Sequence, residues 1–204
     1  EKPEVSPPKK ESSSGNDKKE VIKNKDCRYD IVFVIDASGS LRKRYQHQLE
    51  IASKLIDKFN FEKSQIGVIR YSGRKRSKVA ISLGSKHTKE EFNAEFLHMP
   101  FMGGTTYTDE ALDKAFEEIT GPNIRADALP LVIVFTDGFS QPDPTESAKK
   151  IHAKSIPTFA IGITDGQIVN ENELKSIAST PKNVFLDSNI NELEQLFVKL
   201  SENC

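Results

Sequence analysis

Short apolar runs alternate with segments of helical periodicity along most of this chain. The run "DIVFVID" (30–36) is continuous, which is typical of a strand buried on both faces. The apolar residues from Leu41 to Phe59 recur every three or four positions, which places them on one face of a helix. Further strands are predicted at 65–72, 77–83, 130–137, 157–163 and 183–187, and further helices at 88–99, 108–120, 145–154, 170–179 and 189–203.

The order of these elements predicts the fold class. Strands that alternate with helices indicate a mainly parallel sheet with helices on both faces. The strands at 65–72 and 77–83 are joined by the short turn "GRKR", and so short a connection requires an antiparallel pair. We therefore predict a doubly wound α/β domain of Rossmann-like type, in which a six-stranded, mainly parallel sheet has one antiparallel edge strand.

The first 26 residues have a different composition. They hold seven Lys, six acidic residues, four Ser and three Pro, but only three aliphatic side chains. Such a segment buries too little apolar surface to offset the entropy lost on ordering. We expect a disordered linker over 1–26 and one domain over 27–204. Since the chain begins without Met and with no signal-peptide pattern, we also expect it to be a piece of a larger multidomain protein.

Oxygen-bearing side chains follow two of the predicted strands. In "DASGS" (36–40), Asp36, Ser38 and Ser40 come directly after the first strand, and Asp137 ends the fourth. Ligands of open α/β sheets bind outside the carboxyl ends of the strands, where the strand order reverses. If the first and fourth strands are neighbours, both carboxylates lie beside one crevice. The threonines of "GGTTYTDEAL" (103–112), which precede a predicted helix, are a third source of oxygen ligands.

These groups suit a hard metal ion. Two carboxylates and three hydroxyls, with no Cys or His, favour Mg²⁺ or Mn²⁺. An open coordination position would then favour a carboxylate from a partner. Each residue alone also has an ordinary interpretation: Ser38, Ser40 or Thr106 can cap a helix, and Asp137 with Gly138 can form a turn.

The combination resembles the von Willebrand factor A (vWA) domain, also called the integrin I domain, over residues 27–204. Its metal-ion-dependent adhesion site (MIDAS) has the pattern D-x-S-x-S, then a Thr in G-G-x-T-x-T, then an Asp at the end of the fourth strand. Here these motifs read "DASGS", "GGTTYT" and "TDG". The residues that match the metal-binding positions are Asp36, Ser38, Ser40, Thr106 and Asp137.

The resemblance implies a non-enzymatic adhesion or recognition module. A protein ligand, with extracellular matrix among the candidates, would complete the metal shell with a Glu or Asp side chain. By the same analogy the last helix (189–203) could shift when the shell rearranges. The segment 164–174 is too short for the extra helix of collagen-binding integrin domains, which argues against that mode of collagen binding.

The two cysteines lie near the ends of the predicted domain. Cys27 precedes the first strand and Cys204 ends the last helix, so both fall on the face opposite the crevice. This arrangement allows a disulfide between them, which would indicate an extracellular setting, either secreted or on the ectodomain of a membrane protein. Two unrelated free thiols are the alternative.

Two basic segments stand out. Arg42, Lys43 and Arg44 follow the first motif, and we hypothesise a partner-binding rim made of Arg42, Arg44, Tyr107 and Phe139. The turn "GRKRSK" (73–78) could bind sulfated glycans, or it could be an ordinary solvated turn. Residues 27–204 carry a net charge of −2 and no aromatics interleave with these basic residues, so nucleic acid is not expected as a partner.

Two other function classes remain as alternatives. A metal-dependent phosphohydrolase of the aspartyl-phosphatase type would need a second Asp where Ser38 stands. No Walker-A or G-x-G-x-x-G loop occurs either. An intracellular vWA domain that serves as an assembly scaffold is the other alternative, and the redox state of the two cysteines separates it from an extracellular module.

Overall fold

The computed structural model describes residues 26–202. The linker expected over 1–26 lies outside the described residues apart from Asp26, and so does Cys204. The strands are β1 (Tyr29–Asp36), β2 (Gln65–Tyr71), β3 (Lys78–Ile81), β4 (Leu129–Thr136), β5 (Thr158–Gly162) and β6 (Val184–Leu186). The helices are α1 (Tyr45–Ile56), α2 (Lys89–Phe96), α3 (Thr108–Ile119), α4 (Thr145–His152), α5 (Glu171–Ile177) and α6 (Ile190–Glu202).

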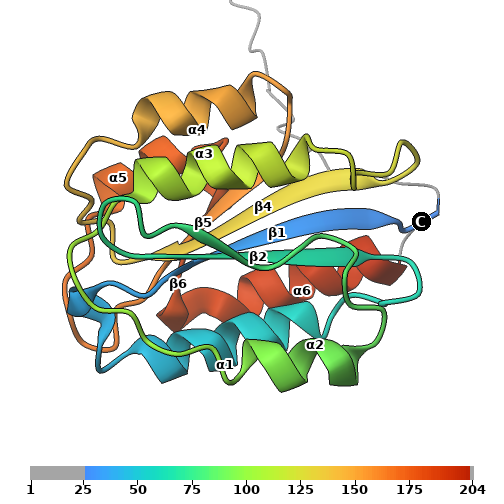
Figure 1. Ribbon diagram of the computed structural model, residues 1–204, viewed down its shortest axis with the longest axis horizontal. Coiled ribbons are helices and arrows are strands. Elements are labelled where there is room, and N and C mark those ends of the chain that lie inside the picture. Colours follow the sequence, from blue (N-terminus) through green and yellow to red (C-terminus); the bar gives the residue numbers. More distant parts are fainter. Residues whose placement is uncertain (1–25, 203–204) are drawn as a thin grey trace, which may run out of the picture.

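The sheet has the predicted topology. Its six strands lie in the order β3-β2-β1-β4-β5-β6, and the order reverses between β1 and β4 (Figure 1). β3 pairs antiparallel with β2 at one edge, and the other pairs are parallel. The doubly wound α/β fold with one antiparallel edge strand is therefore confirmed.

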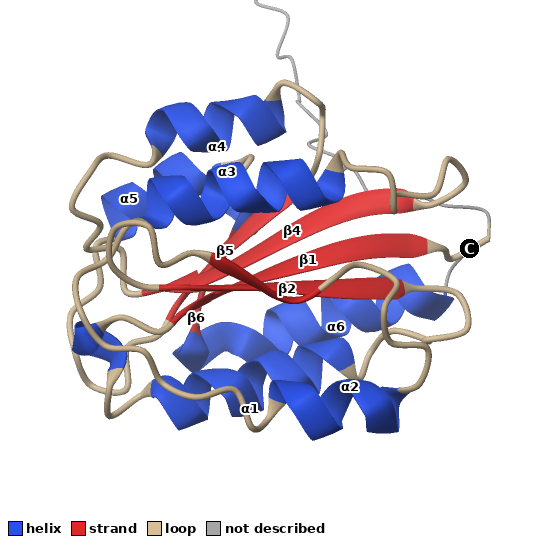
Figure 2. Cartoon of the chain, viewed as in Figure 1, coloured by secondary structure: helices blue, strands red, loops and turns tan. Residues whose placement is uncertain are grey.

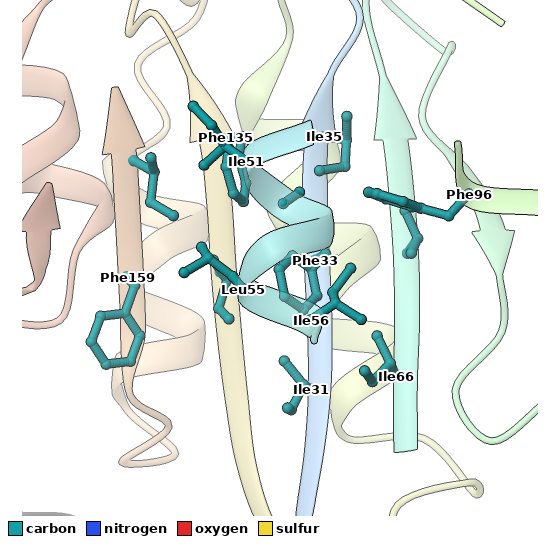
Figure 3. Close-up of a cluster of buried hydrophobic side chains, with 14 of the residues drawn as sticks. Ile31, Phe33, Ile35, Ile51, Leu55, Ile56, Ile66, Phe96, Phe135 and Phe159 are labelled. Carbon is teal, nitrogen blue, oxygen red and sulfur yellow. The ribbon is translucent and has the colours of Figure 1, made fainter. Parts of the chain in front are cut away.

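Helices cover both faces of the sheet, as the cartoon shows (Figure 2). α1, α2 and α6 lie on one face, and α3, α4 and α5 lie on the other (Figure 1). Because side chains of a strand alternate between faces, β1 contributes to both layers of the core. Ile31, Phe33 and Ile35 pack on the α1 side (Figure 3), whereas Val32 and Val34 pack on the α3 side.

β1 is enclosed on both faces and along both of its edges. All eight of its residues are buried, and it pairs with a neighbour on each side. Removing the ring of a buried Phe such as Phe33 typically costs about 3–5 kcal/mol. The strand therefore forms a rigid base for the residues that follow it.

The start of the first helix differs from the sequence prediction. Instead of one helix from Leu41 to Phe59, a 3-10 turn covers Gly39–Leu41 and α1 begins only at Tyr45. The backbone N–H of Arg44 donates to the carbonyl of Leu41 at 2.9 Å, which closes a separate turn. Since Leu41 is buried in either arrangement, apolar spacing could not distinguish them.

Polar contacts between segments that are distant in sequence stabilise the amino end of β1. Asp30 is fully buried, and its carboxylate accepts from the backbone N–H of Arg125 at 2.7 Å and from its Nε at 2.9 Å. The Tyr29 hydroxyl donates to the carbonyl of Leu200 at 2.9 Å. The last turns of α6 therefore lie beside the start of β1, close to the buried Cys27.

Candidate metal centre

Pairing of β1 with β4 brings the carboxylates of Asp36 and Asp137 to the same end of the sheet. Ile35 pairs with Phe135, so Asp36 and Asp137 both follow at the carboxyl end of the sheet. The Thr136 hydroxyl donates to Asp36 Oδ2 at 2.9 Å, which ties the two strand ends together. The sequence-based placement of Asp36 and Asp137 beside one another is thus reproduced.

The "DASGS" segment and the glycine turn before Thr106 are joined through their backbones. The N–H of Gly39 donates to the carbonyl of Gly104 at 2.8 Å, and the N–H of Gly103 donates to the carbonyl of Ala37 at 2.8 Å. A Cβ on Gly39 would lie 2.9 Å from the Gly104 oxygen, so only glycine permits this approach. Gly103 and Gly104 have φ of 68° and 94°, which few other residues adopt.

Thr106 is held between two further segments. It is 5% exposed, and its carbonyl accepts from the backbone N–H of Gln141 at 2.8 Å. The N–H of Tyr107 donates to the carbonyl of Ser72 at 2.9 Å. The loops after β1, β2 and β4 therefore all contact the 103–107 segment, and this network brings Thr106 to the same end of the sheet as the two carboxylates.

Asp36 has neutral hydrogen-bond donors. Its Oδ1 accepts from the backbone N–H of Ser38 at 2.8 Å, and its Oδ2 accepts from the hydroxyls of Thr136 at 2.9 Å and Tyr71 at 3.3 Å. Burial, together with the charge of Asp137, raises the pKa of Asp36 to about 6 against the lowering effect of the hydrogen bonds from Ser38 and Thr136. A nearby cation would stabilise its charged form.

Only one of the two carboxylate oxygens of Asp137 accepts a hydrogen bond within the described residues. The side chain is 1% exposed, and Oδ2 accepts from the Arg44 guanidinium at 3.1 Å. Oδ1 is buried without a hydrogen-bond partner in the described part of the chain. Because a buried carboxylate oxygen without a partner is costly, this atom is the strongest indication that the site suits a cation.

The two serines complete the set of oxygen donors. Ser38 is fully buried, whereas Ser40 is exposed, and their hydroxyl oxygens are 3.2 Å apart. Within residues 26–202 no three His, Cys, Asp or Glu side chains gather as a metal-binding group. A metal at this site would therefore depend on hydroxyl oxygens beside the two carboxylates, and such a set fits a hard cation.

Arg44 occupies an unexpected position. It is 6% exposed, and its guanidinium donates to Asp137, to the carbonyl of Ser40 at 3.1 Å and to the carbonyl of Ile163. The sequence had suggested a rim position beside Arg42. Since Arg42, Lys43 and Arg44 are equivalent by composition, nothing in the sequence showed that the third of them points inward.

Three polar neighbours of the site were not predicted from the sequence. Tyr71 and Thr136 end the buried strands β2 and β4, and both donate to Asp36. Glu173 on α5 accepts from the backbone N–H of Ser140, and burial together with nearby carboxylates raises its pKa to about 7. Tyr71 and Thr136 could have been found from the sequence, because each is a polar residue at the carboxyl end of an apolar run.

A hollow opens beside Ser40 and Asp137. It has a volume of about 630 Å³, and it is lined in part by Arg42, Phe139 and Ile168. Phe139 is 48% exposed and Ile168 is 83% exposed. Of the hypothesised rim, Arg42 and Phe139 lie at the surface, Tyr107 is half-buried, and Arg44 is inside.

The fold and the site together define a class: a doubly wound α/β domain with oxygen ligands gathered where its strand order reverses. The von Willebrand factor type A domain family matches residues 30–199, and the chain belongs to this family.

Relatives of known name are similar over most of the chain. The mouse collagen alpha-1(XX) chain is 32% identical over 160 residues, which cover 76% of this chain and 12% of the relative. Human matrilin-1 is 32% identical over 182 residues, which cover 85% of this chain and 35% of the relative. The chain thus spans about a third or less of the length of these relatives.

Solved structures share the architecture. Proximal thread matrix protein 1 from the mussel byssus, in a form described as having a zinc-occupied MIDAS motif, superposes with a TM-score of 0.74 at 27% identity. The match covers 87% of this chain and 49% of that one. A manganese-loaded Plasmodium vivax TRAP protein has the same fold, with a TM-score of 0.70 at 21% identity.

Proposed function

We propose that this domain is an extracellular recognition module that binds a protein ligand through a divalent metal. Asp36, Ser38, Ser40, Thr106 and Asp137 would form an intact MIDAS for Mg²⁺ or Mn²⁺. The observation that carries the proposal is the unpartnered, buried Oδ1 of Asp137 beside a second buried carboxylate. The zinc-occupied MIDAS motif of the mussel protein, at 27% identity, supports it.

Each residue of the proposed site would contribute a different oxygen ligand. Ser38, Ser40 and Thr106 supply hydroxyl oxygens, and Asp137 supplies the oxygen that Arg44 leaves unengaged. A bound divalent ion would offer an open position to a carboxylate oxygen of a Glu or Asp on the ligand. The hollow beside Ser40 would receive the side chains that flank this carboxylate.

An extracellular setting is supported by the named relatives, which are collagens and matrilins. We propose that a disulfide joins Cys27 and Cys204. Cys27 is 7% exposed at the start of β1, and the Tyr29–Leu200 hydrogen bond brings the last turns of α6 to the same place. None of the helices within residues 26–202 combines the length and the apolar content that a membrane span requires.

A non-enzymatic role fits the same observations. The collagen and matrilin names describe structural matrix proteins, and Ser38 stands where an aspartyl-phosphatase would need its second carboxylate. An intracellular scaffold predicts two free thiols instead of a disulfide, so intact mass before and after reduction separates the two settings.

Metal titration with melting temperature as the readout tests the proposal. At 100 times its Kd, Mg²⁺ should stabilise the wild type by about 2.7 kcal/mol. In a domain of this size that is a shift of roughly 5–11 °C. Ser40→Ala should lose most of this shift with little change in EDTA, because its exposed hydroxyl contacts only Ser38 among the described residues.

Ser85→Ala is the matched control, since Ser85 is also exposed but lies beyond β3, at the other end of the sheet. It should respond to Mg²⁺ as the wild type does. If millimolar Mg²⁺ or Mn²⁺ left the melting temperature of the wild type unchanged, the proposed metal site would be wrong.

A further inference from the structure

We propose that exposed basic residues beside the metal centre form a second binding surface, for a linear sulfated polysaccharide. This surface, which we call the cation cluster, consists of Arg42, Lys43, Arg74, Lys75 and Arg76. It comes from two loops that are distant in sequence, one after β1 and one between β2 and β3. Its binding would not need the metal, so it stands independently of the proposed MIDAS function.

The two loops meet at one turn. Arg76 Nη1 donates to the carbonyl of Gly103 at 3.3 Å, and its Nη2 donates to the carbonyl of Met102 at 3.2 Å. Arg42 Nη2 lies 3.7 Å from where a Cβ of Gly103 would be. Guanidinium groups from the two loops therefore both lie close to Gly103, and Lys43, Arg74 and Lys75 are their neighbours in sequence.

Contacts of Arg42, Lys75 and Arg76 order part of the cation cluster before any ligand arrives. The N–H of Arg76 donates to the carbonyl of Gly73 at 3.0 Å, which closes the turn between β2 and β3. The backbone N–H of Lys75 donates to a Glu110 carboxylate oxygen at 2.6 Å. The Arg42 guanidinium lies 4.9 Å from the centre of the Phe101 ring. Such ordering reduces the entropy lost on binding.

The charges of the cation cluster are not neutralised within the described residues. None of the five side chains forms an ion pair with a carboxylate of residues 26–202, whereas elsewhere on the surface Lys89 pairs with Asp57 and Lys150 with Asp113. Glu110 contacts the turn through the backbone of Lys75 and not through its ammonium group. The cluster is therefore available to external anions, although residues 27–204 carry a net charge of −2.

The chemistry of the cation cluster favours a polysaccharide over a protein. Protein interfaces are usually anchored by aromatic or Arg side chains in buried, well-packed pockets and are poor in Lys, whereas all five residues of the cluster are exposed. The strongly exposed apolar residues, Phe139 and Ile168, line the hollow beside Asp137. Arg42 and Lys43 also line this hollow, whereas Arg74, Lys75 and Arg76 do not. The ring of Phe101 is covered by Arg42. Repeated sulfates along a chain need guanidinium and ammonium groups but no apolar anchor.

Binding of a heparin octasaccharide in EDTA tests the inference. The wild-type chain should bind it, and the affinity should fall steeply as salt rises. Arg74→Gln with Lys75→Gln should weaken binding by roughly tenfold, which is what two exposed ion pairs contribute. Neither side chain is buried, so the variant should fold, and its Mg²⁺-induced stabilisation should equal that of the wild type.

The matched control is Lys154→Gln with Lys182→Gln. Both lysines are exposed at the amino ends of β5 and β6, so this variant changes the net charge equally at the opposite end of the sheet. It should bind heparin as the wild type does, and an equal loss would show that only net charge matters. Failure of the metal titration would leave this result unaffected, so the two proposals fail separately.

Two further probes test the class of ligand. Unsulfated hyaluronan should bind at least tenfold more weakly than heparin at equal salt. A poly-glutamate peptide should also bind more weakly, because the cation cluster has no apolar anchor for a polypeptide. Equal or tighter binding of either probe, or no binding of heparin at low salt, would overturn the inference.

Discussion

Replacing Arg44 with Met should make the domain depend on a divalent metal for its stability. In the absence of metal the Arg44 guanidinium is the cation that Asp137 contacts, at 3.1 Å, and the two side chains are 7% and 1% exposed. Methionine has a similar length and can fill much of the same space. It leaves the Asp137 carboxylate buried without a counter-charge.

The size of the effect follows from these contacts. Removing one partner of a buried ion pair costs about 3–5 kcal/mol, because the other charge stays buried and uncompensated. The carbonyls of Ser40 and Ile163 lose a donor as well. For a domain of this size about 1 kcal/mol corresponds to 2–4 °C, so the melting temperature in EDTA should fall by roughly 6–20 °C.

A bound divalent ion would supply the charge that the variant lacks. It would also no longer be repelled by the neighbouring guanidinium. Saturating Mg²⁺ should therefore raise the melting temperature of Arg44→Met more than that of the wild type. Thermal melts of both proteins in EDTA and across a Mg²⁺ series measure this difference.

Two variants serve as controls for this prediction. The exposed Arg74→Met should stay within about 0.5 kcal/mol of the wild type. The double variant Arg44→Met, Asp137→Asn should recover stability in EDTA and lose the response to Mg²⁺. If Arg44→Met melted at the wild-type temperature in EDTA, or if Mg²⁺ raised both proteins equally, the reasoning about Asp137 would be refuted.

Three more predictions concern other parts of the molecule. Gly39→Ala should destabilise by about 1–2 kcal/mol and weaken the Mg²⁺ response, because its Cβ would lie 2.9 Å from the Gly104 oxygen; an unchanged melting temperature and Mg²⁺ response would contradict it. Burial raises the pKa of Glu173 from 4.5 to about 7, so the folded state binds more protons in that range. Stability in EDTA should therefore fall as pH rises from about 4.5 to about 7. This fall should be smaller in Glu173→Gln, as melts across pH would show, and identical slopes would count against it. Reduction of the proposed Cys27–Cys204 disulfide should lower the stability by up to about 5 kcal/mol and add two hydrogens to the intact mass; an unchanged mass would refute the disulfide.

Much of the architecture follows from local pattern. β1 is apolar at every position between Asp30 and Asp36, and a continuous run of this length is typical of a strand covered on both faces. The short turn at 73–76 forces the antiparallel edge, and the parallel order of the remaining strands places Asp36 beside Asp137. The positions of the candidate ligands at this end of the sheet therefore follow from the sequence pattern.

The environment of those ligands could not be inferred in the same way. Arg44 looks like its two basic neighbours in sequence, and its burial depends on a carboxylate 93 residues away. The close approach of Gly39 to Gly104 depends on how two loops meet, which no local propensity describes. Such contacts between distant segments determine the charge balance and the shape of the site, and they form only when the sheet brings these segments together.

The two ends of β1 show why this balance matters. Asp30 is the second residue of β1 and Asp36 is its last, and both are fully buried. Asp30 has the guanidinium of Arg125 at 2.8 Å as its counter-charge. Asp36 has only neutral donors among the described residues, and its neighbour Asp137 already engages Arg44. Two buried carboxylates thus share one cation at this end, and an uncompensated buried charge is costly. The carboxyl end of the strand consequently has the charge deficit that a bound cation would correct, whereas the amino end has none.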